Sequence, residues 1–263
     1  MGSFFGKKVR REDEKIYGLI GFPLSHSFSQ TFFNQKFETE HINARYINFE
    51  IPDISDFMEI FSEYPSIAGL NVTIPYKQLV IPYLQGLDPL AERVGAVNVI
   101  KLERGNKAND FKLIGFNSDV AGFANSIRPL LKPCHKGALV LGSGGASRAV
   151  CVALEDLGLK TLVVSRTPRE GMISYSDITP AIMDEYKVIV NTTPLGMYPH
   201  TDRCPDIPYD LINSDFLCYD LLYNPDVTLF MKKSAEHGAE TKNGLEMLLL
   251  QAFESWEIWT GRR

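Results

Sequence analysis

The chain reads Gly137-Ala138-Leu139-Val140-Leu141-Gly142-Ser143-Gly144-Gly145-Ala146 near its centre, and this stretch decides how its second half folds. A short apolar run ends in closely spaced glycines, and an amphipathic segment follows from Ala146 to Leu157. Strand, glycine-rich turn and helix in this order predict a Rossmann unit. Gly142, Gly144 and Gly145 would let the backbone approach a pyrophosphate, whose charge the helix N-terminus stabilises. Since Ser147 stands where the third glycine of G-x-G-x-x-G is expected, a plain glycine-rich turn is the alternative.

Apolar runs and helical patterns alternate on both sides of this stretch, which predicts mostly parallel sheets covered by helices. Strands are expected at Ile16–Gly21, Ala44–Phe49, Ile67–Val72, Thr161–Val164, Val188–Val190 and Phe216–Tyr219, and a hairpin at Val97–Leu102 and Phe111–Ile114 around Glu103–Asp110. Helices are expected at Phe28–Phe37, Ile54–Phe61, Val120–Leu131, Ala146–Leu157 and Gly244–Trp259. The predicted fold is α/β with two domains, an N-terminal substrate domain (residues 1–118 with 243–263) and a Rossmann domain (residues 119–242). The apolar last helix is expected to pack back on the first domain.

Composition narrows the function classes. The 263 residues carry a net charge of −5 and no long basic run, so a nucleic-acid partner is not expected. No apolar stretch is long enough for a signal peptide or a membrane span, and residues 1–14 are interpreted as a solvated tail. Four scattered cysteines without C-x-x-C spacing and five unclustered histidines argue against a metal site and favour the cytoplasm.

Arg166 indicates which dinucleotide would bind. It follows the predicted strand Thr161–Val164, at the point where an enzyme that prefers NAD carries an Asp or Glu for the ribose 2′-hydroxyl. No acid stands there, and a guanidinium suits a 2′-phosphate. The sequence therefore predicts NADP, with a solvated surface charge as the structural alternative.

Lys77 and Asp119 are the candidates for proton transfer. Lys77 ends Asn71-Val72-Thr73-Ile74-Pro75-Tyr76-Lys77, and Asp119 ends Gly115-Phe116-Asn117-Ser118-Asp119. A lysine can exchange a proton with a substrate hydroxyl, and a nearby carboxylate can orient it. A proton acceptor together with a dinucleotide site is what an alcohol dehydrogenase without a metal requires. The structural alternative is an ion pair that joins two loops.

The motifs around these residues resemble the shikimate dehydrogenases over most of the chain. His26-Ser27-Phe28-Ser29 is similar to that family's serine pair, Asn71–Lys77 to N-V-T-x-P-x-K, Gly95–Asn98 to G-A-x-N and Gly115–Asp119 to G-x-N-T-D. Further along, Gly142–Arg148 is similar to G-A-G-G-A-S-R, Ser165–Thr167 to N-R-T, Asn191–Met197 to N-A-T-S-x-G-M and Gly244–Gln251 to G-x-x-M-L-x-x-Q. The order of the motifs is more specific than any one of them.

The resemblance implies NADP-linked interconversion of 3-dehydroshikimate and shikimate, a step toward the aromatic amino acids, by a monomer or homodimer. Lys77 would be the acid/base, with Asp119 beside it. By the same resemblance the substrate would be held by Ser27 and Ser29 at its carboxylate, by Thr73, Asn98, Asp119 and Gln251 at its ring hydroxyls, and by the phenol of Tyr223. The cofactor would contact Gly142, Ser143, Gly144, Gly145, Ala146, Ser165, Arg166, Thr167, Asn191, Leu221 and Gly244.

Four residues depart from the family pattern: Gln30 stands for proline, Ser118 for threonine, Ser143 for alanine and Ser165 for asparagine. Three alternatives stay open. One is a quinate/shikimate dehydrogenase of broader range that uses NAD. Another is a sensor of shikimate-like acids without turnover. The third is a dehydrogenase of another small metabolite such as a folate derivative.

Overall fold

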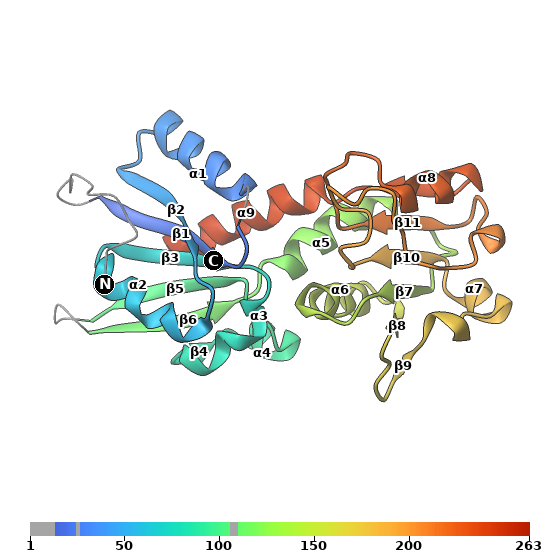
Figure 1. The fold of residues 1–263 in the computed structure, drawn as a ribbon, viewed down its shortest axis with the longest axis horizontal. Helices are drawn as coiled ribbons and strands as arrows, with labels where there is room; N and C mark the ends of the chain where they lie inside the picture. The colour runs from blue at the N-terminus through green and yellow to red at the C-terminus, as the bar shows by residue number, and fades with distance from the viewer. Residues whose placement is uncertain (1–13, 25–26, 106–109) are drawn as a thin grey trace. The chain divides into compact units, whose positions relative to one another are not determined.

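The structure is a computed structural model that describes residues 14–24, 27–105 and 110–263. Residues 1–13 of the predicted tail, His26 of the serine motif and positions 106–109 of the predicted hairpin turn lie outside the described residues. Figure 1 shows the elements coloured along the chain.

Two compact units divide the chain. One comprises Met1–Asp88, Val97–Phe116 and Ile258–Arg262, and the other comprises Pro89–Ala96, Asn117–Glu257 and Arg263. The last helix contributes to both, because only its final turn clusters with the first unit. The predicted division into a substrate domain, residues 1–118 with 243–263, and a cofactor domain, residues 119–242, stays a prediction.

The first unit is built on a six-stranded sheet, counted over the described residues, in the order β2-β1-β3-β5-β6-β4. β1 pairs in parallel with β2 and β3, whereas β5 pairs antiparallel with β3 and β6, and β4 runs parallel to β6. The predicted hairpin is therefore present as β5 and β6. The strands span β1 Lys15–Gly21, β2 Ala44–Glu50, β3 Ile67–Val72, β4 Gly86–Leu87, β5 Val99–Arg104 and β6 Phe111–Phe116.

The second unit is built on a six-stranded sheet whose described strands are all parallel, in the order β12-β11-β10-β7-β8-β9. Every residue of β7, β10 and β11 is buried, which explains why these strands read as continuous apolar runs rather than alternating ones. The strands span β7 Gly137–Leu141, β8 Lys160–Val164, β9 Met172–Ile173, β10 Val188–Asn191, β11 Leu217–Asp220 and β12 Glu240–Lys242.

Helices connect the strands in both units (Figure 1). The α-helices span α1 Phe28–Thr39, α2 Glu59–Glu63, α3 Tyr76–Leu79, α4 Pro89–Val94, α5 Asp119–Ile127, α6 Gly145–Asp156, α7 Pro180–Glu185, α8 Leu229–Glu236 and α9 Leu245–Thr260. Short 3-10 helices span η1 Ile54–Met58, η2 Ile81–Tyr83, η3 Arg128–Leu130, η4 Tyr175–Asp177 and η5 Tyr209–Leu211.

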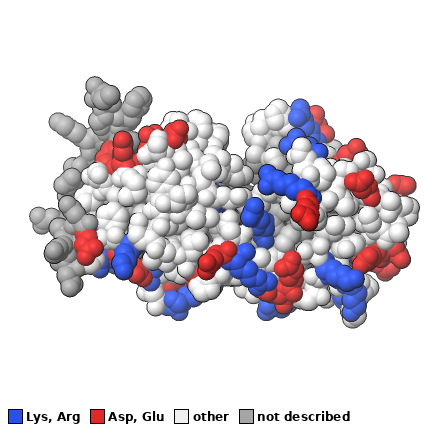
Figure 2. Space-filling view, turned by 90° about the horizontal axis from the view of Figure 1, so that it is seen from below, with Lys and Arg blue, Asp and Glu red and all other residues white. Residues whose placement is uncertain are grey.

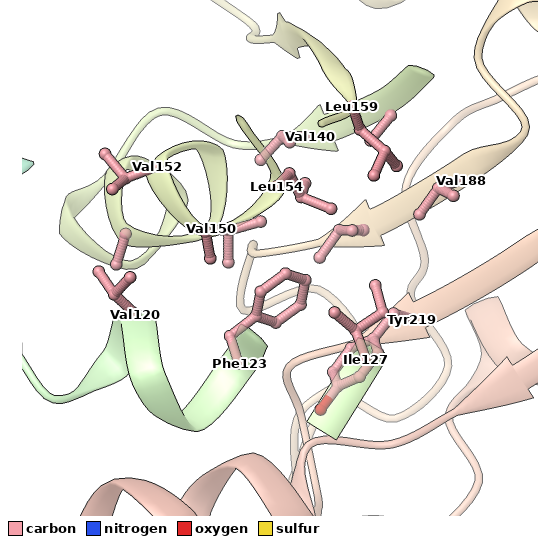
Figure 3. Packing of buried hydrophobic residues seen from close by; sticks show 14 of the residues in the cluster. Val120, Phe123, Ile127, Val140, Val150, Val152, Leu154, Leu159, Val188 and Tyr219 are labelled. Carbon is pink, nitrogen blue, oxygen red and sulfur yellow. The ribbon is translucent and has the colours of Figure 1, made fainter. Parts of the chain in front are cut away.

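The second unit has a hydrophobic cluster on each face of its sheet: one lies against α5 and α6, which pack against each other, and the other includes Met183 of α7 and Phe230 of α8. Figure 3 shows Phe123 and Ile127 of α5 directed toward the strands that carry Val140, Val188 and Tyr219. The rings of Phe123 and Tyr219 lie 5.1 Å apart at 65°, an edge-to-face geometry. The Tyr219 hydroxyl is 2.8 Å from Ser126 Oγ, so this buried polar group is satisfied.

The first unit has an aromatic core in which the end of α9 takes part. Trp259 lies 4.9 Å from Tyr17 and 5.3 Å from Phe33, measured between ring centroids. Its Nε1 donates to the carbonyl oxygen of Ile100 at 3.1 Å. A side chain at Gly69 would overlap the indole, so the strand β3 needs glycine at this point. The final turn of the last helix thus packs on the first sheet, as expected.

Most predicted elements are present within a few residues of their expected bounds. The predicted helix at Ile54–Phe61 is instead a 3-10 helix followed by one turn of α-helix, and that at Val120–Leu131 ends at Ile127 before η3. The elements β4, β9, β12, α3, α4, α7 and α8 were not predicted, because short edge strands and helices of four to eight residues leave little periodic signal.

Candidate active site

Two loops of the first unit come together where β1 and β3 end. Gly21 closes β1, and a Cβ there would lie 2.5 Å from Thr73 Cγ2, which only glycine avoids. The backbone N–H of Phe22 donates to Ile74 O at 3.1 Å, and that of Thr73 donates to Ile20 O at 2.9 Å. The loop that leads to the serine motif is thus joined to the loop that carries Thr73.

Lys77 lies one turn beyond Thr73, in the short helix α3. The N–H of Tyr76 donates to Thr73 O at 2.8 Å, and the Tyr76 hydroxyl donates to Ile51 O at 2.6 Å, which anchors this turn. The carbonyl oxygen of Lys77 accepts from Val97 N at 2.7 Å. Lys77 is half-buried, in a position set by main-chain contacts on both sides.

Asn98 lies beside the same loop. Its carbonyl oxygen accepts from Val72 N at 2.9 Å and from Asn71 Nδ2 at 3.3 Å, and its N–H donates to Phe116 O at 3.1 Å. The side chain is nearly fully buried. The structure therefore brings Thr73, Lys77 and Asn98 to one edge of the first sheet, although Asn98 is 21 positions from Lys77 in sequence.

Ser27 and Ser29 begin helix α1. Ser27 is its N-cap, and Ser27 Oγ accepts a hydrogen bond from Gln30 N at 3.2 Å. A proline at position 30 would have no N–H for this bond, so the departure Gln30 adds a contact to Ser27. A capping hydroxyl accepts with a lone pair and keeps its own proton to donate.

Ser29 is linked to the loop of Lys77 through Tyr46. Burial raises the pKa of the Tyr46 phenol well above its ordinary value, and a hydrogen bond from Ser29 opposes that shift. The Tyr46 hydroxyl donates to Asn71 Oδ1 at 2.7 Å. Since Asn71 Nδ2 contacts the Asn98 carbonyl, one buried chain of polar groups connects Ser29 with Asn98.

In the second unit, the residues on either side of Asp119 lie against Gln251, although 132 positions separate Asp119 from Gln251 in sequence. Asp119 is buried at the start of α5, and the preceding Ser118 has its Oγ 3.4 Å from Gln251 Oε1 and 3.2 Å from Ser255 Oγ. One turn later, a Cβ at Gly122 would lie 2.9 Å from Met247 O and 3.0 Å from Gln251 Cβ. Glycine at this point is what lets α5 and α9 approach so closely.

The glycine-rich turn between β7 and α6 fits a dinucleotide pyrophosphate. Gly142 has φ +110°, a conformation that other residues rarely adopt, and a Cβ there would lie 2.7 Å from Thr192 Oγ1. Gly144 is the N-cap of the 12-residue helix α6, makes no side-chain cap, and has open space where a Cβ would stand. No side chain at Gly144 covers the first backbone N–H groups of α6, so an anion can approach them closely. Ser147 takes the place of the third glycine and is buried.

The turn after β8 carries the predicted 2′-phosphate residues. Arg166 and Thr167 are exposed, and Ser165 is buried with its Oγ 3.3 Å from both Thr167 N and Ser143 Oγ. Two of the departures from the family pattern, Ser143 and Ser165, are thus in contact. The Arg166 charge also reaches Tyr175, whose pKa is raised by burial and lowered to a smaller extent by Arg166.

Asn191 ends β10, and Leu221 follows the adjacent strand β11 at the same edge of the sheet. Leu141 pairs in register with Asn191, and Asn191 pairs with Asp220. Asn191 is fully buried, its Oδ1 accepts from Thr193 N at 3.0 Å, and its carbonyl oxygen accepts from Leu221 N at 3.0 Å. The carboxyl edge of a parallel sheet is where ligands bind in doubly wound folds.

Gly244 and Tyr223 complete the residues predicted for this unit. The N–H of Gly244 donates to Leu222 O at 2.9 Å, and a side chain at Gly244 would overlap the Leu221 carbonyl. Tyr223 is 38% exposed, and partial burial raises the pKa of its phenol. The raised pKa keeps this hydroxyl protonated near neutral pH.

Sequence reasoning missed several residues that position this set: Tyr46, Asn117, Gly122, Asp220, Thr228 and Ser255. Asn117 donates through Nδ2 to Ala96 O at 2.9 Å and accepts from Val120 N at 3.3 Å, so it shapes the turn before Asp119. It lies inside the G-x-N-T-D motif, and that motif could have identified Asn117 from the sequence. The others stand in helices or strands or, like Thr228, at a helix N-cap, and only tertiary contact shows their role in the site.

Two other features are absent from the part of the chain that the structure describes. No three His, Cys, Asp or Glu side chains there come together as metal ligands. No described helix combines the length and the apolar character needed to cross a bilayer. Figure 2 shows one face of the molecule, on which basic and acidic side chains are interspersed without a broad area of one charge.

Two protein families match parts of the chain. Residues 19–100 match the shikimate dehydrogenase substrate binding domain, and residues 244–263 match the shikimate 5'-dehydrogenase C-terminal domain. The first match contains Ser27, Ser29, Thr73, Lys77 and Asn98, and the second contains Gly244 and Gln251.

Individual proteins are similar over nearly the full length. Shikimate dehydrogenase (NADP(+)) of Carboxydothermus hydrogenoformans is 37% identical over 95% of this chain and 92% of its own. A crystal structure of a shikimate dehydrogenase in complex with NADP+ superposes with a TM-score of 0.83 at 32% identity, covering 96% of this chain and 92% of that one. The shikimate 5-dehydrogenase of Thermus thermophilus, in complex with NADP(H) and shikimate, gives a TM-score of 0.80 at 28% identity, covering 94% of each chain.

Proposed function

The chain belongs to the shikimate dehydrogenase family, and we propose on that basis that it catalyses the reversible, NADP-dependent reduction of 3-dehydroshikimate to shikimate. The observation that carries this proposal is Lys77, retained on the anchored turn after β3 with Thr73 and Asn98 beside it. A protein that only sensed the ligand would have no use for a proton-transfer group at that place.

The substrate would be held by groups already oriented for hydrogen bonding. Ser27, which accepts from Gln30 N, keeps its hydroxyl proton for the substrate carboxylate, and Ser29 binds beside it. Tyr223 would add a phenol near that carboxylate. Thr73, Asn98, Asp119 and Gln251 would bind the ring hydroxyls and would thereby favour a small polyhydroxy acid.

Lys77 would act as the acid/base, with Asp119 orienting the reacting hydroxyl. Bound NADPH supplies the hydride that reduces the carbonyl carbon. Lys77 Nζ donates a proton to the oxygen of that carbonyl, so that a neutral hydroxyl forms, and takes the proton back in the oxidative direction.

The second unit would hold the cofactor. The turn of Gly142, Ser143, Gly144, Gly145 and Ala146 presents the N-terminus of α6 to the pyrophosphate. Ser165, Arg166 and Thr167 would bind the 2′-phosphate, with Arg166 supplying the charge that selects NADP over NAD. Asn191, Leu221 and Gly244 would contact the remainder of the cofactor.

The protein is proposed to work in the cytoplasm as a monomer or homodimer, without a nucleic-acid partner. The four cysteines are free, which suits a reducing compartment. The functional domains are proposed to be residues 1–118 with 243–263 for the substrate and residues 119–242 for the cofactor.

Initial rates of cofactor reduction by the purified chain test this proposal, with shikimate and quinate each offered with NADP and with NAD. Turnover confined to shikimate with NADP is the expected result. Turnover of quinate or with NAD would instead identify an enzyme of broader range. Ligand binding without turnover for any pair of substrate and cofactor would refute the proposed catalysis and would favour a sensor of shikimate-like acids.

A further inference from the structure

Asp220, at the end of β11, is a fully buried carboxylate that none of the proposed binding or catalytic roles uses. Its Oδ2 accepts from Thr228 Oγ1 at 2.6 Å, and its Oδ1 accepts from Leu222 N at 3.0 Å and from Asn191 Nδ2 at 3.0 Å. Asn191 and Thr228 are also fully buried. Three donors from three different segments thus converge on one carboxyl group.

The partners of Asp220 belong to the cofactor edge of the sheet. Asn191 pairs in register with both Leu141, which precedes the glycine-rich turn, and Asp220. Leu222 holds Gly244 through its carbonyl oxygen, and Leu221 N donates to Asn191 O. The Asp220 carboxylate is therefore connected, directly or through one further hydrogen bond, to the segments of three residues proposed to contact the cofactor: Asn191, Leu221 and Gly244.

The Asn191 amide is oriented by the bond from its Nδ2 to Asp220 and by a longer one, 3.4 Å, from the same atom to Leu195 O. Because Nδ2 donates to Asp220, Oδ1 is turned toward Thr193, where it accepts from both the N–H at 3.0 Å and the hydroxyl at 2.7 Å. Thr193 Oγ1 in turn accepts from Leu195 N at 3.2 Å. As an acceptor for Asn191, Asp220 thus helps to hold the loop from Asn191 to Leu195 in its conformation.

We propose that Asp220 is a positioning residue, which holds the segments of Asn191 and Leu221 in the arrangement that binds the dinucleotide. The inference rests on the proposed NADP site. Burial raises the pKa of Asp220 to about 6, against the opposing effect of its three hydrogen bonds. Three donors directed at a buried carboxyl group that is costly to ionise indicate that an acceptor is used there, which separates this role from simple packing.

The test compares Asp220→Asn with the wild-type chain and with Asp210→Asn, the same change on an exposed carboxyl group of η5. NADP+ binding is titrated at pH 8, thermal unfolding is followed in the same buffer, and KM is measured for NADP+ and for shikimate. We expect Asp220→Asn to weaken NADP+ binding about tenfold or more, the scale of lost charge-assisted hydrogen bonds. The KM for shikimate and the unfolding temperature should not worsen, and Asp210→Asn should match the wild type.

An NADP+ affinity of Asp220→Asn within twofold of wild type would overturn the inference. A KM raised equally for NADP+ and shikimate, together with a lowered unfolding temperature, would also overturn it, because a merely structural role predicts that result. Failure of the wild-type chain to bind NADP+ would instead refute the proposed cofactor site itself. If Asp220→Asn does not fold, Thr228 supplies a second comparison. Thr228→Val removes the hydroxyl donor and should weaken NADP+ binding, whereas Thr228→Ser keeps the donor and should restore it; equal affinities for this pair would contradict the proposal.

Discussion

Gly122 of α5 lies directly against Gln251 of α9, at a distance where a Cβ on the glycine would be 3.0 Å from the Cβ of the glutamine. The contact puts Gln251 beside the turn that Asp119 begins, with Ser118 Oγ 3.4 Å from Gln251 Oε1. Gly122, which has no proposed ligand contact, therefore positions Gln251 relative to the turn of Asp119, and both of these residues are proposed to bind the substrate.

Gly122→Val is expected to raise the KM for shikimate about tenfold or more, because the added side chain would move α9 and with it Gln251. The KM for NADP should change less. Steady-state kinetics with each substrate varied in turn measures both. Asn125→Ala, at an exposed position of the same helix, is the control; an unchanged KM for shikimate in Gly122→Val would show that the close approach is not needed.

Lys77→Ala is expected to lower kcat by about 10² or more while leaving shikimate binding largely intact, the usual scale for loss of an acid/base group. Turnover and shikimate affinity are measured on the same preparation. Gln78→Ala changes the exposed neighbour in α3 and should retain activity. Near-normal turnover of Lys77→Ala would refute the acid/base role.

Arg166→Ala is expected to raise the KM for NADP about 10-fold to 100-fold, since one charge-assisted pair with the 2′-phosphate is lost. The KM for NAD, which has no 2′-phosphate, should be unaffected, so the ratio of activity with NADP to activity with NAD should fall. Arg169→Ala removes an exposed charge from the same loop as a control. Equal preference for NADP in Arg166→Ala and wild type would place the 2′-phosphate elsewhere.

Asp220 also predicts a pH dependence of stability. Its pKa is raised from 3.8 to about 6 in the folded chain, chiefly by desolvation. Between these two pH values the folded state keeps a proton that the unfolded state has released, so stability falls as pH rises through this window. At pH 8 the accumulated cost is about 3 kcal/mol, at 1.36 kcal/mol per pKa unit.

Asp220→Asn removes this cost, so its unfolding temperature relative to wild type should rise between pH 5 and pH 8. Tyr209 of η5, whose pKa Asp220 itself helps to raise, and Cys218 on β11 titrate well above this window. His135 shifts in the opposite direction, but it is present in both chains and cancels in the difference. A difference that does not vary with pH would show that Asp220 is not ionised near neutrality.

Local pattern predicted the elements that are long and periodic. The apolar runs at β7, β10 and β11 are buried on both faces of a parallel sheet, so each was readable without knowing its neighbours. The same holds for the glycine turn, because the positive φ of Gly142 is a local requirement of the backbone. The two-residue strands β4 and β9 gave no such signal, since their pairing depends on what lies beside them.

The sequence by itself determined the family, the α/β class and the chemical candidates, because Lys77, Arg166 and the glycine-rich turn stand in short motifs whose residue types the chemistry requires. Only the tertiary structure decided which side chains support them. Asp220 meets Thr228 and Asn191, Gly122 meets Gln251, and Tyr46 meets Asn71 across separations that no local pattern encodes. Such partners are selected by close packing and by the cost of leaving a buried polar group without a hydrogen bond, and both act only once the chain is folded.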